Sequence, residues 1–210
     1  TKGKGFQASV GSVFQRRQMK NDFDKQPNKI DCNWISQQKI FMLKSNLNFP
    51  NEYIIVDVGM HNGSDAEYYA RRGFNVIAFE ANPLLANEGK ERFEANRLPI
   101  TVINKAIAES ASEHINFYIN KTSDQFSSVD PKIGSRGAGA ESIEVRTCNL
   151  AEELEKIKDR IHMIKIDIEG NDYIALCQLK NAGISPPFIS VENGDPNFLE
   201  VMREMGYKRF

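Results

Sequence analysis

The sequence predicts an α/β fold in which helices cover both faces of a mostly parallel sheet. Short apolar runs rich in β-branched residues alternate with helix-like segments, and the connections between them are short. The runs are nearly continuous in apolar residues, as in parallel strands that are buried on both faces. A chain of 210 residues, 40% of them hydrophobic, is long enough for one domain with a sizeable core and too short for two ordinary ones.

Three strands and two helices are expected in the first part of this alternation. The helix after the first strand is predicted to begin at Ser64, which forms an S-x-x-E capping box with Glu67, and to end at Gly73. Asn82 followed by Pro83 predicts the start of the next helix, because a capping side chain precedes proline at the first helical position. The strands are expected over residues 53–58, 75–80 and 100–103.

The second part of the alternation contains a long polar segment. Ile115, Phe117 and Ile119 alternate with polar residues, which predicts a strand nearer the sheet edge. Residues 120–142 are expected to form a long polar loop of the kind usually kept for binding. Beyond it we expect strands over residues 143–147, 162–168 and 188–192, and helices over 149–158, from a cap at Asn171 to Gly183, and over 196–205.

Residues 1–50 differ from the α/β region at 51–210. Their first part is basic, and few of its apolar residues recur at helical or strand spacing. The simpler interpretation is a solvated arm lying on the domain, and the alternative is a lid or a basic, substrate-facing flap. Residues 34–47 are expected to form a helix ahead of the main domain.

Composition excludes several classes of protein. Lys and Arg number 27 against 28 Asp and Glu, so no bulk field attracts the protein to nucleic acid or to an anionic membrane. No apolar run has the length of a membrane-spanning helix. The three cysteines form no C-x-x-C pair, which disfavours a disulfide framework or a zinc site. No signal peptide is visible, so the cytoplasm is favoured, while the compartment and the oligomeric state stay open.

The first strand ends in a glycine-containing loop. Ligands of parallel α/β sheets bind beyond the carboxyl ends of the strands. Gly59 and Gly63 permit a tight turn there, and the following helix N-terminus offers free N–H groups. His61 stands where the dinucleotide pattern G-x-G-x-x-G needs glycine, so a carboxylate or an adenosine group is favoured over a pyrophosphate. Glu80 ends the second strand 23 residues after Asp57, close to the offset at which an acid meets a ribose.

Several sequence blocks resemble one methyltransferase family. They are D-V-G-M-H-N-G at 57–63, A-F-E-A-N-P at 78–83, N-K-A-I at 104–107, K-I-D-I-E-G-N-D at 165–172 and S-V-E at 190–192. Together they resemble the FkbM family of S-adenosylmethionine-dependent class I methyltransferases, many of which methylate hydroxyl oxygens, often on sugars. The resemblance implies a Rossmann-like sheet with S-adenosylmethionine over the first two strand ends.

The resemblance also implies which residues contact the cofactor. Glu80 would hold the ribose, and Ala106 would lie near the far side of the adenine. The adenine would lie beside Ala81 and Asn82. The methionine end would be lined by Asp57, Gly59, Asn62 and Gly63. Asp167 is a candidate both for contacting the cofactor and for catalysis. Two features depart from the family: His61 replaces a small residue, and the chain ends at Phe210 where the last strands should begin.

Three carboxylates are expected at two neighbouring strand ends, and they are the main catalytic candidates. Asp167, Glu169 and Glu192 could remove a hydroxyl proton or orient the substrate. Alternatively Asp167, Asp195 and a neighbouring acid could hold Mg²⁺, although we assign no metal. A purely structural alternative is that Glu169 and Asp172 favour the N-terminus of the following helix. His61 is the other candidate base, because imidazole titrates near neutral pH.

The leading hypothesis is a methyltransferase that acts on a hydroxyl oxygen, most plausibly of a sugar or glycan. Gln125, Ser127 and Ser128 lie in the polar loop, where they could contact the hydroxyls of such an acceptor. The balanced charge and the lack of a basic-aromatic stripe argue against a nucleic-acid acceptor. The alternatives are an NAD-binding oxidoreductase of Rossmann type and a non-catalytic binding protein that keeps the fold.

Overall fold

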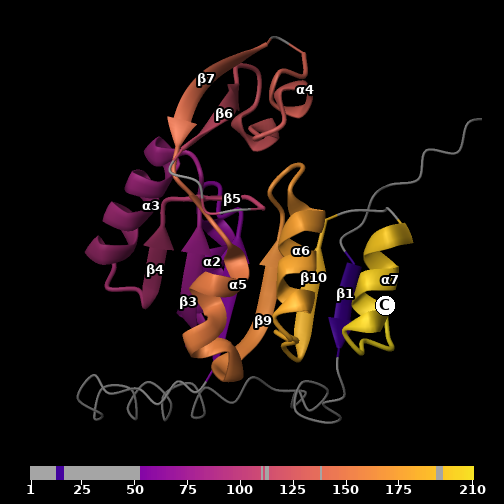
Figure 1. The fold of residues 1–210 in the computed structure, drawn as a ribbon. Coiled ribbons are helices and arrows are strands. Elements are labelled where there is room, and N and C mark those ends of the chain that lie inside the picture. The colour runs from indigo at the N-terminus through magenta and orange to yellow at the C-terminus, as the bar shows by residue number, and fades with distance from the viewer. Residues whose placement is uncertain (1–12, 17–52, 110, 112–113, 138, 193–195) are drawn as a thin grey trace, which may run out of the picture.

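The protein is built around a six-stranded sheet (Figure 1). The computed structural model describes residues 13–16, 53–109, 111, 114–137, 139–192 and 196–210. The strands lie in the order β1 (Val13–Arg16), β10 (Phe188–Val191), β9 (Ile161–Ile166), β2 (Ile54–Val58), β3 (Asn75–Phe79) and β4 (Ile100–Ile103). Only β1 pairs antiparallel, so the predicted parallel sheet is confirmed.

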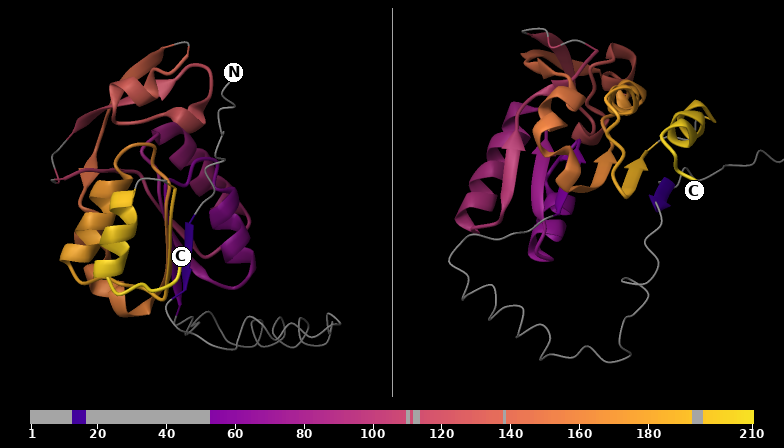
Figure 2. Two further views of the ribbon diagram at one scale, coloured as in Figure 1. Left: turned by 90° about the vertical axis from the view of Figure 1, so that its right-hand side faces the viewer. Right: turned by 60° about the horizontal axis from the view of Figure 1, so that its bottom comes forward.

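Helices cover both faces of this sheet, as predicted (Figure 2). On one face lie α2 (Ser64–Arg71) and α3 (Pro83–Ala95); on the other lie α5 (Leu150–Leu154), α6 (Asp172–Asn181) and α7 (Pro196–Glu204). Side chains of β3 alternate between the two layers: Val76 and Ala78 pack in the cluster with α2 and α3, whereas Phe79 packs in the larger cluster with α5, α6 and α7. No helix among the described residues has both the length and the apolar character needed to cross a membrane.

A hairpin region stands beyond the carboxyl ends of the strands (Figure 1). It consists of β6 (Ile115–Asn120), the 3₁₀ turn η1 (Asp124–Phe126), α4 (Pro131–Gly134) and β7 (Ala140–Val145). A short parallel pair, β5 (Ala106–Ile107) and β8 (Thr147–Cys148), lies at its base, and the 3₁₀ helix η2 (Glu155–Arg160) follows α5. Strand β6 pairs with β7 and forms an isolated bridge from Tyr118 to Ser128, but it does not join the edge of the main sheet. The predicted loop 120–142 contains regular structure.

Two helix caps differ from the sequence prediction. Gly63 holds the N-cap position of α2, and the predicted capping box is replaced by Asn62, whose side-chain oxygen accepts from the backbone N–H of Ser64 at 3.0 Å. The side chain of Asn171 donates instead to the carbonyl of Ile107 at 2.8 Å. The predicted cap of α3 is confirmed, because the side chain of Asn82 accepts from the backbone N–H of Leu84.

One edge of the main sheet is formed by β1, a strand that the sequence did not predict. Strand β1 was not predicted, because four residues of mixed polarity carry no clear period. It pairs with β10, and the described residues after β10 contain α7 and no further strand. The helix predicted over residues 34–47 and the rest of the N-terminal arm lie outside the described residues.

Candidate active site

A cleft opens at the carboxyl ends of β2 and β9, where the chain order of the sheet reverses. From β2 the chain continues to β3 and β4 on one side and returns through β9 and β10 on the other. This topological switch point is the usual ligand position in such sheets. The cleft has two lobes that share Gly59, His61, Gln125, Asp167 and Glu169. We call them the inner lobe, which continues over Glu80 and Ala106, and the acid lobe, which continues over Lys165 and Glu192.

Gly59 is required where β2 enters the loop. Its φ of 91° lies in the region that favours glycine, and a Cβ at this position would lie 1.8 Å from the carbonyl oxygen of Asp167. The backbones that follow β2 and β9 are therefore in direct contact. Gly63 has a different role, because a Cβ there would lie 2.5 Å from the ring of Phe93. It lets the loop pack on α3 and does not line either lobe.

Glu80 joins the loops that follow β2 and β3. Its side chain is 8% exposed and accepts from the backbone N–H of His61 at 2.7 Å and of Asn82 at 2.8 Å. Burial raises the pKa of Glu80, although these N–H donors oppose the rise. A carboxylate has about four acceptor positions, so both oxygens keep capacity for hydroxyl donors in the inner lobe.

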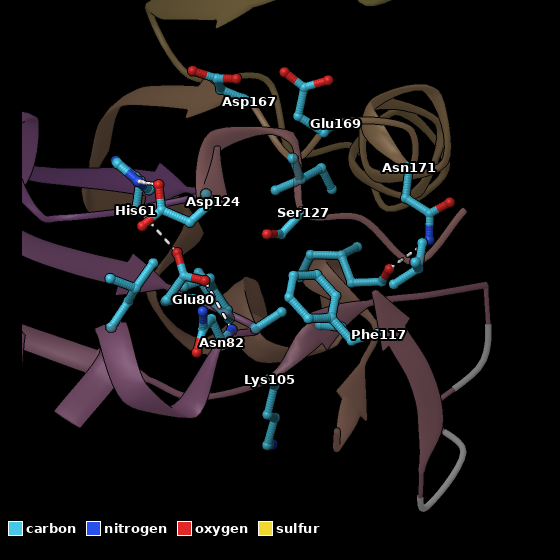
Figure 3. A pocket seen from close by; sticks show the side chains of 18 of the residues that line it. His61, Glu80, Asn82, Lys105, Phe117, Asp124, Ser127, Asp167, Glu169 and Asn171 are labelled. Atoms are coloured by element: carbon cyan, nitrogen blue, oxygen red, sulfur yellow. Dashed lines mark hydrogen bonds and ion pairs between the residues drawn. The ribbon is translucent and has the colours of Figure 1, made fainter. Parts of the chain in front are cut away.

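The rest of the inner lobe is largely apolar (Figure 3). Phe117 of the hairpin and Ala106 of β5 line it opposite Glu80, and both are almost fully buried. The apolar lining is completed by Phe79, Ala81, Leu85, Ile107, Val129 and Ile168. An apolar slot with one buried carboxylate fits a flat base attached to a dihydroxylated ring, as in an adenosine group.

His61 connects the loop after β2 to the hairpin region. It has a positive φ of 52°, and its side chain contacts η1. Its Nε2 lies 3.0 Å from the Oδ1 of Asp124, and both residues line the inner lobe (Figure 3). The loop after β2, in which His61 stands in place of a small residue, is therefore joined to the hairpin region through Asp124.

Lys165 lies among three carboxylates at the floor of the acid lobe. Its Nζ is 3.2 Å from both Asp65 and Asp167 and 3.6 Å from Asp57. Burial disfavours the ammonium, yet Asp57, Asp167 and Asp65 together raise the pKa of Lys165. Burial also raises the pKa of Asp57 to about 7, against the attraction of Lys165. Asp57 is fully buried and supports the cleft from below without lining it.

The three predicted catalytic acids do come together. Asp167, Glu169 and Glu192 offer oxygen atoms that all lie within 4.8 Å of one another. A hydrogen bond with Asp167, followed by the repulsion between the two carboxylates, raises the pKa of Glu192 to about 7. Burial raises the pKa of Glu169, which has a positive φ of 51° and lies 4.0 Å from Arg136. The spacing would also suit a divalent cation, but the ammonium of Lys165 already supplies positive charge to Asp167.

The remaining predicted residues divide by position. Ala81 and Asn82 line the inner lobe, Asn62 lines the acid lobe, and Gln125 and Ser127 contribute from the hairpin. Ser128 is fully buried and lines neither lobe: its hydroxyl donates to the carbonyl of Glu169 at 2.5 Å and accepts from the N–H of Asp130. Asp195 lies outside the described residues.

Sequence reasoning missed several residues that line the cleft. Lys105, Phe117, Asp124 and Phe126 were not among the candidates. Phe117 was assigned only to a strand pattern, and Lys105 lay inside the N-K-A-I block at 104–107. Asp124 and Phe126 belong to the segment predicted as a loop, where no period indicates which side chains face a ligand.

The fold and the cleft together define a class: a doubly wound α/β protein with its ligand cleft at the topological switch point. A family model for the methyltransferase FkbM domain matches residues 57–209, and the chain belongs to this family. Its cofactor is S-adenosylmethionine. A solved structure of a TehB-like S-adenosylmethionine-dependent methyltransferase from Corynebacterium glutamicum is similar over 82% of this chain and 80% of that one, with 12% identity and a TM-score of 0.36. No curated protein matches the chain.

Proposed function

We propose that this methyltransferase transfers the methyl group of S-adenosylmethionine to a hydroxyl oxygen of a sugar or glycan. The main support is the pair of Asp167 and Glu192 in the acid lobe, because the pKa of Glu192 is about 7. A hydroxyl must lose its proton as it is methylated, so a nearby group that accepts a proton at neutral pH favours an oxygen acceptor.

The residues present fit the cofactor in the inner lobe. Glu80 would accept from the ribose hydroxyls, and Ala106 would flank the adenine together with Phe117. Ala81 and Asn82 would border the same group, while Gly59, Asn62 and Asp167 would border the methionine end where the two lobes meet. When bound, S-adenosylmethionine supplies an electrophilic methyl group on a sulfonium.

The acid lobe would hold and deprotonate the acceptor. Carboxylate oxygens of Glu192 and Asp167 lie within 4.8 Å of each other, so the pair can take up one proton and share it between two oxygens. Lys165 lies 3.2 Å from Asp167 and places a positive charge beside the pair. His61 is the second candidate for the proton, since its ring lies at the boundary of both lobes. Gln125 and Ser127 would orient the acceptor from the hairpin.

Calorimetric titration with S-adenosylmethionine and S-adenosylhomocysteine, with NAD as the control ligand, tests the cofactor site. We expect micromolar binding of the first two and none of NAD. Glu80→Gln should weaken the binding at least about 10-fold, because it removes the charge and leaves one amide donor facing hydroxyl donors. Glu88→Gln, at an exposed position of α3, is the matched control and should bind like the wild type. Binding that is equal in both variants would contradict the ribose-binding role of Glu80.

A further inference from the structure

The acid lobe contains a partly exposed aromatic side chain among its polar groups. Phe126 is 39% exposed and lines this lobe together with Gln125. Among the remaining described residues of the lining, charged and polar side chains predominate, including Asp65, Asp167, Glu169 and Glu192. A large hydrophobic residue left partly exposed inside a polar cleft has a cost in water, which a ligand that covers the ring would remove.

The position of Phe126 is fixed by the fold. Its backbone N–H donates to the carbonyl of Ser123 at 3.0 Å, which closes the turn. The turn is held by Asn120, a buried residue at the end of β6, whose side-chain oxygen accepts from the N–H groups of Thr122 and Ser123. The amide group of Asn120 donates to the carbonyls of Gly134 and Arg136. A buried asparagine that satisfies four backbone groups makes this turn a rigid support.

Arg136 adds a second constraint on the ring. Its guanidinium carbon lies 5.9 Å from the centroid of the Phe126 ring, and a guanidinium nitrogen lies 4.0 Å from Glu169. The cation thus links the aromatic ring to the catalytic acids at the rim of the lobe.

The charges of the lobe select against anions. Four carboxylates line it, and Lys165 is the one ammonium among the described lining residues. That ammonium is already within 3.6 Å of three carboxylates, one of them the buried Asp57. Carboxylate oxygens accept hydrogen bonds, so the fitting ligand presents donors such as hydroxyl groups and carries no negative charge.

An aromatic face opposite hydrogen-bond acceptors defines the chemistry of the ligand. The ring of Phe126 can cover an apolar C–H face, while the carboxylates take hydroxyl donors at the edge of the same molecule. We propose that Phe126 is a specificity-determining residue, which forms the platform for the ring of an uncharged sugar, and that the acid lobe rejects sugars bearing a carboxylate. This inference rests on the proposed function, because it concerns the acceptor of the same reaction.

The test places a fluorescent reporter on the platform. The chain has one tryptophan, Trp34, so the double variant Trp34→Phe, Phe126→Trp carries its only indole in the acid lobe. Protein saturated with S-adenosylhomocysteine is titrated with methyl glycosides of neutral hexoses, and in parallel with methyl glycosides of the matching uronic acids. We expect a saturable change in emission with at least one neutral glycoside and at least 10-fold weaker binding of its uronic acid counterpart.

Two further variants separate stacking from general disturbance of the turn. Phe126→Ala should bind the same neutral glycoside at least 10-fold more weakly by calorimetry, and Phe126→Tyr should retain binding. Leu84→Ala, at an exposed position of α3, should behave like the wild type. Each variant is first titrated with S-adenosylhomocysteine, whose affinity should not change.

The outcomes distinguish the two proposals. Failure of S-adenosylhomocysteine to bind the wild-type protein would overturn the proposed function and this inference with it. If S-adenosylhomocysteine binds but no neutral glycoside does, or if the uronic acid glycosides bind equally well, the cofactor site stands and the platform is overturned. Equal glycoside affinities of Phe126→Ala and the wild type would overturn it as well.

Discussion

The two ends of the central sheet are built in opposite ways although the same strands connect them. At the amino ends, the ring of His162 on β9 lies among three aromatic rings, those of Tyr53, Phe74 and Phe188, with centroid distances of 4.9 to 6.1 Å. At the carboxyl ends, β2 and β9 bring Asp57 and Lys165 into register, and Asp167 follows. One end is closed by packing, and the other concentrates charge.

Backbone conformation shows the same contrast. Of the three non-glycine residues with positive φ in the described part of the chain, His61 and Glu169 line the cleft at the carboxyl ends. Such conformations persist where the surrounding structure holds them, and they cluster at functional sites. We infer that the charged, strained carboxyl end of the sheet serves function, whereas the packed amino end contributes to stability. Substitutions at the two ends should therefore have separable effects.

The largest effect is expected from Gly59→Ala at the carboxyl end. The new Cβ would lie 1.8 Å from the carbonyl oxygen of Asp167, which is backbone and cannot rotate away. The ends of β2 and β9 must separate, so we expect a loss of at least about 3 kcal/mol in the free energy of unfolding. Urea unfolding followed by circular dichroism measures this loss, and calorimetry should find no binding of S-adenosylhomocysteine.

Gly183→Ala is the matched control for that substitution. Gly183 has a positive φ of 66°, but a Cβ there would meet nothing within 4 Å. It should cost only the conformational penalty of about 1 kcal/mol and leave cofactor binding intact. Equal losses in the two variants would show that backbone conformation alone, and not the contact between the two strand ends, makes Gly59 necessary.

The next largest effect is expected from Glu192→Gln, and it concerns the rate of the reaction. A base acts when deprotonated, so kcat of the wild type should rise with pH through about 7, the pKa of Glu192, and level off above it. The variant should lose about 10²-fold in kcat together with this acidic limb, at unchanged affinity for S-adenosylhomocysteine. The measurement is the pH profile of methyl transfer to the glycoside that the emission titration identifies.

Glu200→Gln, at an exposed position of α7, controls for the loss of a surface charge and should keep both the rate and the pH profile. A Glu192→Gln variant that retains the acidic limb near pH 7 would assign the proton to another group at the cleft, of which His61 is the first to test by substitution.

The sequence predicted the sheet well because its strands are continuous apolar runs. Each parallel strand of the main sheet agrees with its predicted range to within two residues at either end, since burial on both faces leaves a pattern that one chain can show. The hairpin region was predicted poorly. Its two strands form a sheet of their own, and its central turn is held by the buried residue Asn120, two of whose backbone partners lie 14 and 16 positions away.

The site was predictable to the extent that strand ends determine it. Glu80 and Asp167 follow directly after parallel strands, so their meeting at one edge was expected from topology alone. The partner of His61 was not predictable, because Asp124 lies 63 positions away in a segment without a period. Nor could sequence show that Ser128 is buried: neighbouring serines look alike until the turn determines which hydroxyl faces the cleft.

The smallest effect is expected at the amino end, from His162→Leu, and it appears as a dependence of stability on pH. Burial lowers the pKa of His162, and its Nδ1 is buried without a hydrogen-bond partner. As the pH falls, the imidazole of His162 is therefore protonated more readily in the unfolded chain than in the folded protein. The wild type should lose stability below about pH 6.5, by about 1 kcal/mol for each unit by which the pKa is lowered. In His162→Leu this part of the loss should vanish between pH 7 and pH 5, as measured by urea unfolding.

His114→Leu, at an exposed position, is the control and should keep the wild-type dependence of stability on pH. Because His162 lies at the start of β9 and the cleft at its end, S-adenosylhomocysteine should bind His162→Leu with wild-type affinity. A weakened cofactor site would mean that packing at the amino end is coupled to the cleft.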